Sequence, residues 1–134
     1  MSIPRLSQKE TVERRPAPRP GAAYAADAVL YVPLSGPIAG AEAIRRYEEG
    51  IEAAFPGHTI IVLRYVKEDR ARAVEWEFRG RNDGPICLPQ GVVSPTHRQV
   101  TLRGASIVSL TPRGLVVEEH RYYDVCRLLE QLGR

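Results

Sequence analysis

The residues best suited to chemistry lie near the end of the chain, in the segment EEHRYY at 118–123. Strand-like alternation places Glu119, Arg121 and Tyr123 on one face, because successive side chains of a strand point to opposite sides. Glu119 could act as a base and Tyr123 as a hydroxyl donor, while Arg121 lies beside the carboxylate or clamps an anionic ligand. We take these three as candidate catalytic residues. An Arg–Glu pair that is purely structural explains the same pattern.

His120 lies among these residues but alternates to the opposite face, with Glu118 and Tyr122. Imidazole is the side chain that titrates nearest neutral pH, which makes it a natural general base. A one-residue bulge in this strand would turn His120 inward in place of Arg121. Without a bulge, His120 belongs to the outer or dimer face. His120 is therefore a candidate ligand-binding residue, and its face is left open.

The remaining reactive side chains form no recognisable site. His58 follows a Pro-Gly turn and His97 ends a proline-rich loop, and no carboxylate spacing around the three histidines matches a metal centre. Cys87 and Cys126 have neither metal nor redox spacing and are expected to be free thiols in a reducing compartment. We expect no metal and no cofactor.

Apolar periodicity predicts the elements that position these side chains. Ile44, Tyr47 and Ile51 recur at helical spacing, and the run Val74-Glu75-Trp76-Glu77-Phe78 alternates as a half-buried strand does. Helices on one face of a curved antiparallel sheet make an α+β fold. The predicted elements are a helical turn at 22–28, a strand to Val32, a helix at 41–55, strands at 58–67, 72–81, 98–110 and 115–123, and a helix at 125–132 capped by Asp124.

Four aromatic side chains on these elements are candidates to line a ligand cavity: Tyr31, Tyr47, Trp76 and Phe78. Ordinary core packing explains large apolar side chains on a buried face equally well. The segment 84–96 holds three prolines and two glycines and is expected to be a long loop. Such a loop covers a cavity or forms a loose surface excursion.

Charge and hydropathy exclude two classes of partner. Residues 1–20 carry five basic and two acidic side chains, which accounts for the whole net charge of +3. The excess therefore sits in a proline-rich segment, where Ser7 and Glu10 form a capping-box pattern for a short helix at 8–15, rather than on a folded body as in nucleic-acid binders. No apolar stretch is long enough for a membrane span or a signal peptide, so we expect a cytoplasmic protein.

Pieces along most of the chain resemble, in order and spacing, the SnoaL-like polyketide cyclase group of the nuclear transport factor 2-like superfamily. They are YAADAVLYVP, the G-P-x-x-G turn at 36–40, AEAIRRY, AAFPG, AVEWEFRGRNDGP, VTLRGASIVSL and GLVVEEHRYYDVCRLLEQLG. The resemblance implies a cone, in which a strongly curved antiparallel sheet wraps around helices and leaves a cavity open at one end. It also implies a small apolar or anionic organic ligand and a homodimer. We divide the chain into a basic segment at 1–21 and a cone domain at 22–134.

The resemblance implies catalytic positions as well, and this chain departs from the family at three of them. The acid/base aspartate of the last strand corresponds to Arg121, the histidine of a G-T-H-T-G-like segment to Asn82, and the His-Asp-Pro ending the first strand to Tyr31-Val32-Pro33. Asn82 remains a candidate ligand-binding residue. The family implies a cyclase or isomerase acting on a polyketide-like or cyclic ketone substrate. The three departures keep a non-catalytic ligand-binding or dimerising module as the alternative.

Overall fold

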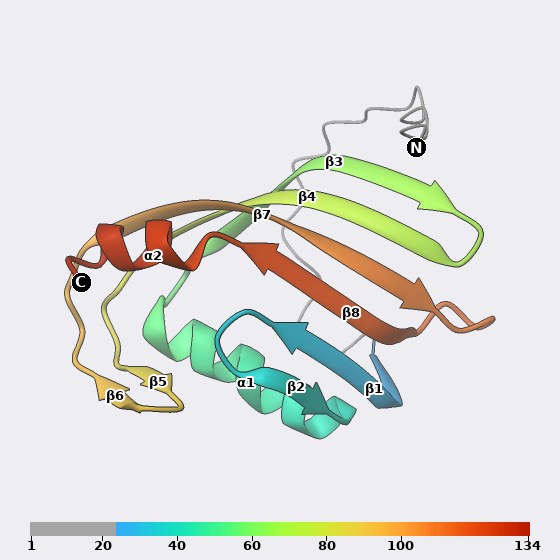
Figure 1. Ribbon diagram of the computed structural model, residues 1–134, viewed down its shortest axis with the longest axis horizontal. Helices are drawn as coiled ribbons and strands as arrows, with labels where there is room; N and C mark the ends of the chain where they lie inside the picture. The colour runs from blue at the N-terminus through green and yellow to red at the C-terminus, as the bar shows by residue number, and fades with distance from the viewer. Residues whose placement is uncertain (1–23) are drawn as a thin grey trace.

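The structure is a computed structural model that describes residues 24–134. The helix predicted at 8–15 lies outside the described residues. The described part is built mainly from one curved sheet and one long helix (Figure 1). Its elements are β1 (Tyr24–Val32), β2 (Gly36–Ala39), α1 (Ala41–Ala54), β3 (Thr59–Glu68), β4 (Ala71–Arg81), β5 (Ile86–Leu88), β6 (Gly91–Val93), β7 (Gln99–Leu110), β8 (Val116–Tyr123) and α2 (Val125–Gln131).

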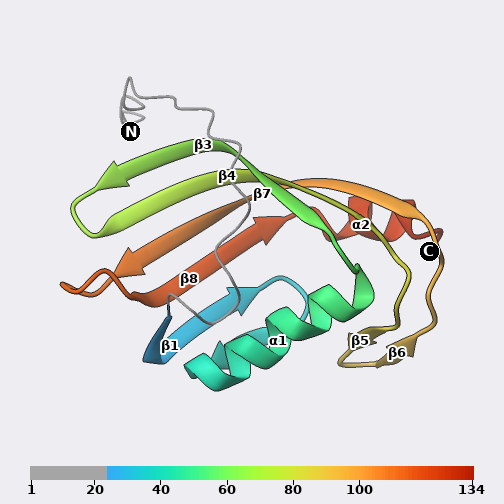
Figure 2. The same cartoon turned by 180° about the vertical axis from the view of Figure 1, so that it is seen from behind.

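Six strands form one sheet in the order β2-β1-β8-β7-β4-β3. All neighbours pair antiparallel except β1 and β8, which run parallel. The sheet bends strongly over α1, which lies on its concave side, and α2 continues from the end of β8 (Figure 2). This arrangement confirms the predicted α+β fold with a curved sheet.

Two apolar clusters hold α1 against the sheet. In the first, Ile44 packs with four side chains of β1, with Tyr47 against its edge. In the second, Ala54 and Phe55 at the end of α1 pack with residues of β4, β7 and Leu132. The apolar residues that recur at helical spacing in the sequence are therefore the ones that pack against the sheet. The predicted cap of the last helix is also confirmed, because the Asp124 carboxylate accepts a hydrogen bond from the Arg127 backbone N–H at 3.1 Å.

The helical turn predicted at 22–28 was wrong, because β1 begins at Tyr24. Alanine favours helices, but that preference is weak and tertiary pairing overrides it. Here Tyr24 pairs with Val116 of β8, and Ala25 and Ala28 are buried in the first cluster. Small side chains suit this position since β1 lies directly against α1.

The loop predicted at 84–96 contains a short hairpin. Ile86 to Leu88 pairs with Gly91 to Val93, and Pro89 and Gln90 form the turn. Each strand has only three residues and lies among prolines and glycines, which are rare in strands. The residue pattern therefore predicted a loop. The hairpin contacts α1 through β5 and lies near the end of that helix (Figure 1).

The register of β8 settles which way its side chains point. Residues 118–123 pair with β7 without a shift, and the irregularity in this pair lies earlier, between Ser109 and Leu110. The bulge that would have turned His120 inward is therefore absent from this stretch. Glu119 is buried at 7% exposure, whereas Tyr122 is 57% exposed on the opposite face.

A buried carboxylate on the outer face gives the fold a pH dependence. Glu77 is 7% exposed and accepts hydrogen bonds from Arg79 and Arg103, and the hydrogen bond from Arg79 is the main cause that lowers its pKa. A carboxylate whose pKa is lowered in the folded state stabilises the fold at pH values above its unfolded pKa. This stabilisation is lost as the pH falls through the folded pKa. We expect Glu77→Gln to lower the thermal midpoint at neutral pH. The thermal midpoints of the variant and the wild type should converge in acid, as the pH falls through the lowered pKa of Glu77, which lies below the ordinary glutamate pKa of 4.5. Calorimetry that finds the same difference between the two midpoints at neutral and at acid pH would contradict this role.

Candidate functional site

A buried ion cluster centres on Arg121, on the inner face of β8. Its Nε donates to Glu119 Oε2 at 2.6 Å, and its Nη2 donates to Glu48 on α1 and to the Tyr24 hydroxyl on β1. The Tyr24 hydroxyl in turn donates to Glu119 Oε1 at 2.5 Å. The side chains of Arg121, Glu119 and Glu48 are all at most 16% exposed. Three elements are thus joined by one guanidinium.

Burial and charge shift the titration of this cluster. Burial by itself would lower the pKa of Arg121, but the carboxylates of Glu48 and Glu119 outweigh it and raise that pKa. Burial, followed by the Glu119 carboxylate, raises the pKa of the Tyr24 hydroxyl. Arg121 is therefore a permanent cation and Tyr24 a permanent hydroxyl at neutral pH. With both carboxylates ionised, Glu48, Glu119 and Arg121 together carry a formal charge of −1.

The third residue on this face of β8 forms a separate pair. The Tyr123 hydroxyl lies near the Tyr47 hydroxyl on α1, and the two groups influence each other's pKa. Burial raises the pKa of both hydroxyls, so both keep their protons at neutral pH. When Tyr47 donates to Tyr123, the proton of Tyr123 is available to another acceptor. Tyr123 can then act as a hydrogen-bond donor to a ligand.

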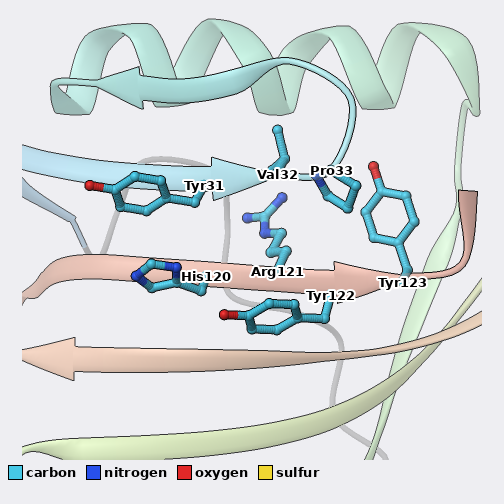
Figure 3. Close-up of a pocket in the computed structure, with 7 residues that line it drawn as sticks. All are labelled: Tyr31, Val32, Pro33, His120, Arg121, Tyr122 and Tyr123. Atoms are coloured by element: carbon cyan, nitrogen blue, oxygen red, sulfur yellow. The ribbon is translucent and has the colours of Figure 1, made fainter.

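A hollow of about 360 Å³ opens beside Arg121 and Tyr123. It is lined by residues at the ends of β1 and β8 and just beyond β1: Tyr31, Val32, Pro33, His120, Arg121, Tyr122 and Tyr123. Figure 3 shows Arg121 and Tyr123 extending from β8 toward β1 and α1, with the rings of Tyr31, His120 and Tyr122 along the strands. Small-molecule sites span roughly 300–1,000 Å³, so this hollow is at the small end of that range.

The path of β1 explains why side chains from both faces of the sheet reach one hollow. The pairing of β1 with β8 ends at Tyr31 and His120, and Pro33 then leads the chain into the turn before β2. Beyond that point β8 has no neighbour on this side, and the sheet has a notch. Inward residues such as Arg121 and outward residues such as His120 therefore border the same space (Figure 3).

His120 lies on the outer side of this notch within a ladder of aromatic rings. Its ring stacks on Tyr31 with centroids 4.3 Å apart and planes within 7°, and Tyr122 lies parallel at 6.3 Å. His120 Nε2 is 2.5 Å from Glu118 Oε1. Two of the predicted ligand-binding residues, Tyr31 and His120, thus border the hollow together with Arg121 and Tyr123.

The other predicted aromatic residues do not border this hollow. Trp76 donates from its indole N–H to the Ser106 hydroxyl at 3.0 Å and packs against Tyr123, with ring centroids 6.3 Å apart. Phe78 belongs to the second core cluster and meets the edge of Phe55. Core packing accounts for both. Tyr47 contacts the site only through Tyr123, and Glu119 only through Arg121 and Tyr24.

Asn82 is fully buried away from the hollow, and its side chain has no capacity left for a ligand. Its amide donates to the carbonyls of Ala54 and Gly84, and its oxygen accepts from the N–H and hydroxyl of Thr96. An asparagine side chain can form two donor and two acceptor bonds of this kind, and all four are used. Asn82 therefore ties α1 to the segment after β6. This corrects the expectation that it contacts a ligand, and we leave it out of the site.

Two members of the cluster were missed by sequence reasoning, and one had a signal. Glu48 follows Ile44 by four residues and precedes Ile51 by three, so it lies on the same helical stripe as the apolar side chains. A charged residue on a buried stripe indicates a partner or a site. Tyr24 had no such signal because the segment around it resembles a helical turn.

Residues 24–134 contain no group of three or more metal-ligating side chains that could hold an ion. Within the same range, no helix is long and apolar enough to cross a membrane.

The bent sheet, the helix on its concave side and the hollow at the sheet's notch define a small α+β cone protein with a ligand-sized opening. The chain belongs to the SnoaL-like domain family, whose model matches residues 10–119. That match begins within the segment at 1–21 that composition had set apart. A comparison with curated protein sequences finds no significant match.

Solved structures with the same fold include three bacterial relatives. A putative SnoaL-like polyketide cyclase from Jannaschia sp. CCS1 is 17% identical with a TM-score of 0.73, covering 82% of this chain and 73% of that one. A hypothetical protein with a ketosteroid isomerase-like fold from Catenulispora acidiphila DSM 44928, in complex with trimethylamine, is 17% identical with a TM-score of 0.68, covering 84% of this chain and 78% of that one. A putative polyketide cyclase from Pseudomonas putida KT2440 is 13% identical with a TM-score of 0.66, covering 83% and 81%. At these identities the likeness shows the fold.

Proposed function

We propose that this protein binds a small cyclic ketone, of the polyketide-like class, in the hollow at the notch and catalyses proton transfer next to its carbonyl group. The observation that carries the proposal is that Arg121 and Tyr123, both hydrogen-bond donors, border one hollow whose rim is aromatic. Removal of a proton α to a carbonyl leaves negative charge on the carbonyl oxygen, and fixed donors stabilise that charge. Cyclisation and isomerisation of ketones both begin with this step.

The hydrogen bonds around Arg121 support its role as a donor to the carbonyl. Nε and Nη2 are engaged by Glu119, Glu48 and Tyr24, whereas no described side chain engages Nη1. The two carboxylates hold the guanidinium in place, so little rearrangement is needed when charge develops. Glu119 serves here as a positioning residue, since both of its oxygens already accept hydrogen bonds.

The charge of the cluster favours a neutral ligand over an anionic one. A free guanidinium could clamp a ligand carboxylate through two hydrogen bonds. In this protein Arg121 already holds two carboxylates, and the cluster carries a formal charge of −1. A third carboxylate would meet net repulsion. A ketone oxygen needs only the N–H groups of Arg121 Nη1 and the Tyr123 hydroxyl. The rings of the ketone can pack on Tyr31 and Tyr122.

The test uses α-tetralone, a bicyclic ketone, in heavy water. If the protein removes and returns an α proton, deuterium enters the carbon next to the carbonyl faster than in buffer, as followed by proton NMR. Replacing Tyr123 by phenylalanine removes one donor to the developing charge and should slow this exchange about 100-fold. Tyr65→Phe is the matched control, because Tyr65 is an exposed tyrosine away from the hollow. Equal rates of deuterium exchange for Tyr123→Phe and the wild type would show that Tyr123 is not part of the site.

A second candidate function is a non-catalytic ligand-binding or dimerising module. It is favoured by the full engagement of Glu119 and by the exposed apolar side chains Ile107 and Tyr122 on the outer face of the sheet. A homodimer formed through that face would bury them. Light scattering that finds a monomer at micromolar concentration would exclude the dimer. Binding of α-tetralone without deuterium exchange would support the non-catalytic role.

A further inference from the structure

The proposed reaction needs a proton acceptor, and the inner cluster does not offer one at the hollow. Both oxygens of Glu119 are engaged, and Glu48 is held by Arg121 Nη2. Neither glutamate borders the hollow. A proton acceptor is therefore expected on the other side of the notch.

His120 is the one imidazole that borders the hollow. Its Nε2 is paired with Glu118 at 2.5 Å, so Nδ1 is the ring nitrogen left for a ligand. The ring is held in plane by stacking on Tyr31, and the side chain is 33% exposed. A base that is oriented by a carboxylate and belongs to a residue bordering a hollow has the arrangement that general-base catalysis requires.

The structure assigns His120 as the proton acceptor of the proposed reaction, with Glu118 as its positioning residue; this inference rests on the proposed function. His120 Nδ1 takes a proton from the α carbon of the ketone. The electrons of the broken C–H bond form the enolate, whose oxygen accepts hydrogen bonds from Tyr123 and Arg121. The imidazolium returns a proton to carbon, at the same position for exchange or at a conjugated position for isomerisation. No other reactant is needed.

The charges around His120 suit this role. In its neutral form the ring gains a proton as the enolate gains a negative charge, so the two charges arise together and attract each other. Glu118 stabilises the imidazolium from the other side. The neighbouring residues on the outer face are Tyr31 of β1, Tyr122 of β8, and Ala105, Ile107 and Ser109 of β7, none of which is an aspartate, glutamate, lysine, arginine or histidine. Glu118 is thus the one charged group on the outer face that faces the ring from these strands.

The experiment compares the deuterium exchange of α-tetralone in variants of the full chain. We expect His120→Ala to lose at least about 100-fold in rate, since general-base catalysis contributes roughly 10²–10⁴-fold. Because the hollow is open, free imidazole added to the buffer should restore part of the exchange in His120→Ala. Glu118→Gln should lower kcat about tenfold with KM unchanged. His97→Ala, which alters an exposed histidine elsewhere, should match the wild type.

The outcomes separate this inference from the function on which it rests. Loss of exchange in His120→Ala with rescue by imidazole supports both. Exchange that persists in His120→Ala, while the wild type is active, overturns the assignment of His120 and leaves the proposed function standing. A wild type with no exchange above buffer overturns both. Binding of α-naphthol, a planar mimic of the enol, reports whether each variant keeps an intact hollow. If a variant binds α-naphthol as the wild type does but has lost deuterium exchange, the substitution has removed the base and has not disturbed the fold.

Discussion

Arg121→Met should lower the free energy of unfolding at neutral pH by about 3–5 kcal/mol, the cost of leaving buried charges without their partner. The guanidinium is the cation that Glu48 and Glu119 share, and all three side chains are at most 16% exposed. Methionine approximates the aliphatic length of arginine, so the loss reports mainly the two unpaired carboxylates. Urea unfolding followed by circular dichroism measures the difference.

A matched set of variants shows whether charge is the cause. In Arg121→Met combined with Glu48→Gln and Glu119→Gln, no buried charge is left unpaired, and most of the lost stability should return, because replacing a whole buried ion cluster is far less costly than breaking it. Glu49→Gln, one position along α1 but with an exposed carboxylate, should change stability by less than about 0.5 kcal/mol. If the triple variant is less stable than Arg121→Met alone, desolvated charge is not what the cluster contributes.

Asn82→Ala should cost about 3 kcal/mol or more. The side chain is fully buried, and its removal leaves the Gly84 carbonyl and the Thr96 N–H without the bonds it provides, while Ala54 loses one of two. Each unsatisfied buried group costs roughly 1–3 kcal/mol, and the cavity adds to this. Thermal and urea unfolding measure the loss.

The control for Asn82 is chosen from the same loop. Gln90→Ala lies in the exposed turn of the β5–β6 hairpin and should stay within about 0.5 kcal/mol of the wild type. Asn82→Asp keeps the bonds from Thr96 but loses both donors and turns a carboxyl oxygen toward the Ala54 and Gly84 carbonyls at a fully buried site, so it should also be clearly less stable than the wild type. A loss below 1 kcal/mol for Asn82→Ala would contradict the fully bonded role given to this residue.

Alternation along β8 was sufficient to predict which residues share a face. The inner set of Glu119, Arg121 and Tyr123 is found as expected, because a strand with period two allows only two assignments and no bulge intervenes. The side chains that form hydrogen bonds with this set were harder to predict. Glu48 carried a signal in its position on the apolar stripe of α1, but Tyr24 did not, because it meets Glu119 across 95 residues of sequence.

The hollow itself could not be predicted from the pattern of residues. Its position depends on where the parallel pairing of β1 with β8 stops, and parallel pairing between the first and last strands is a long-range contact with no local signature. From the sequence alone, His120 could be assigned only to one face of the sheet or the other. The notch makes this question less important, since residues of both faces border it.

The Asn82 prediction failed for a related reason. The resemblance to a family motif places this residue where relatives have a histidine, but the fate of an amide depends on the backbone groups around it. Here a turn at Asp83–Gly84 and the return of the chain at Thr96 bring three backbone groups and a hydroxyl within reach. Such a residue holds the fold rather than the ligand.

The most direct measurement is a crystal structure of the protein with α-naphthol bound. We predict that the naphthol oxygen lies within about 3.2 Å of the Tyr123 hydroxyl or Arg121 Nη1. Its rings should lie between the ends of β1 and β8, with the edge toward His120. A molecule bound elsewhere, or a hollow that stays free of naphthol at saturating concentration, would contradict the claim that this notch is a small-molecule site.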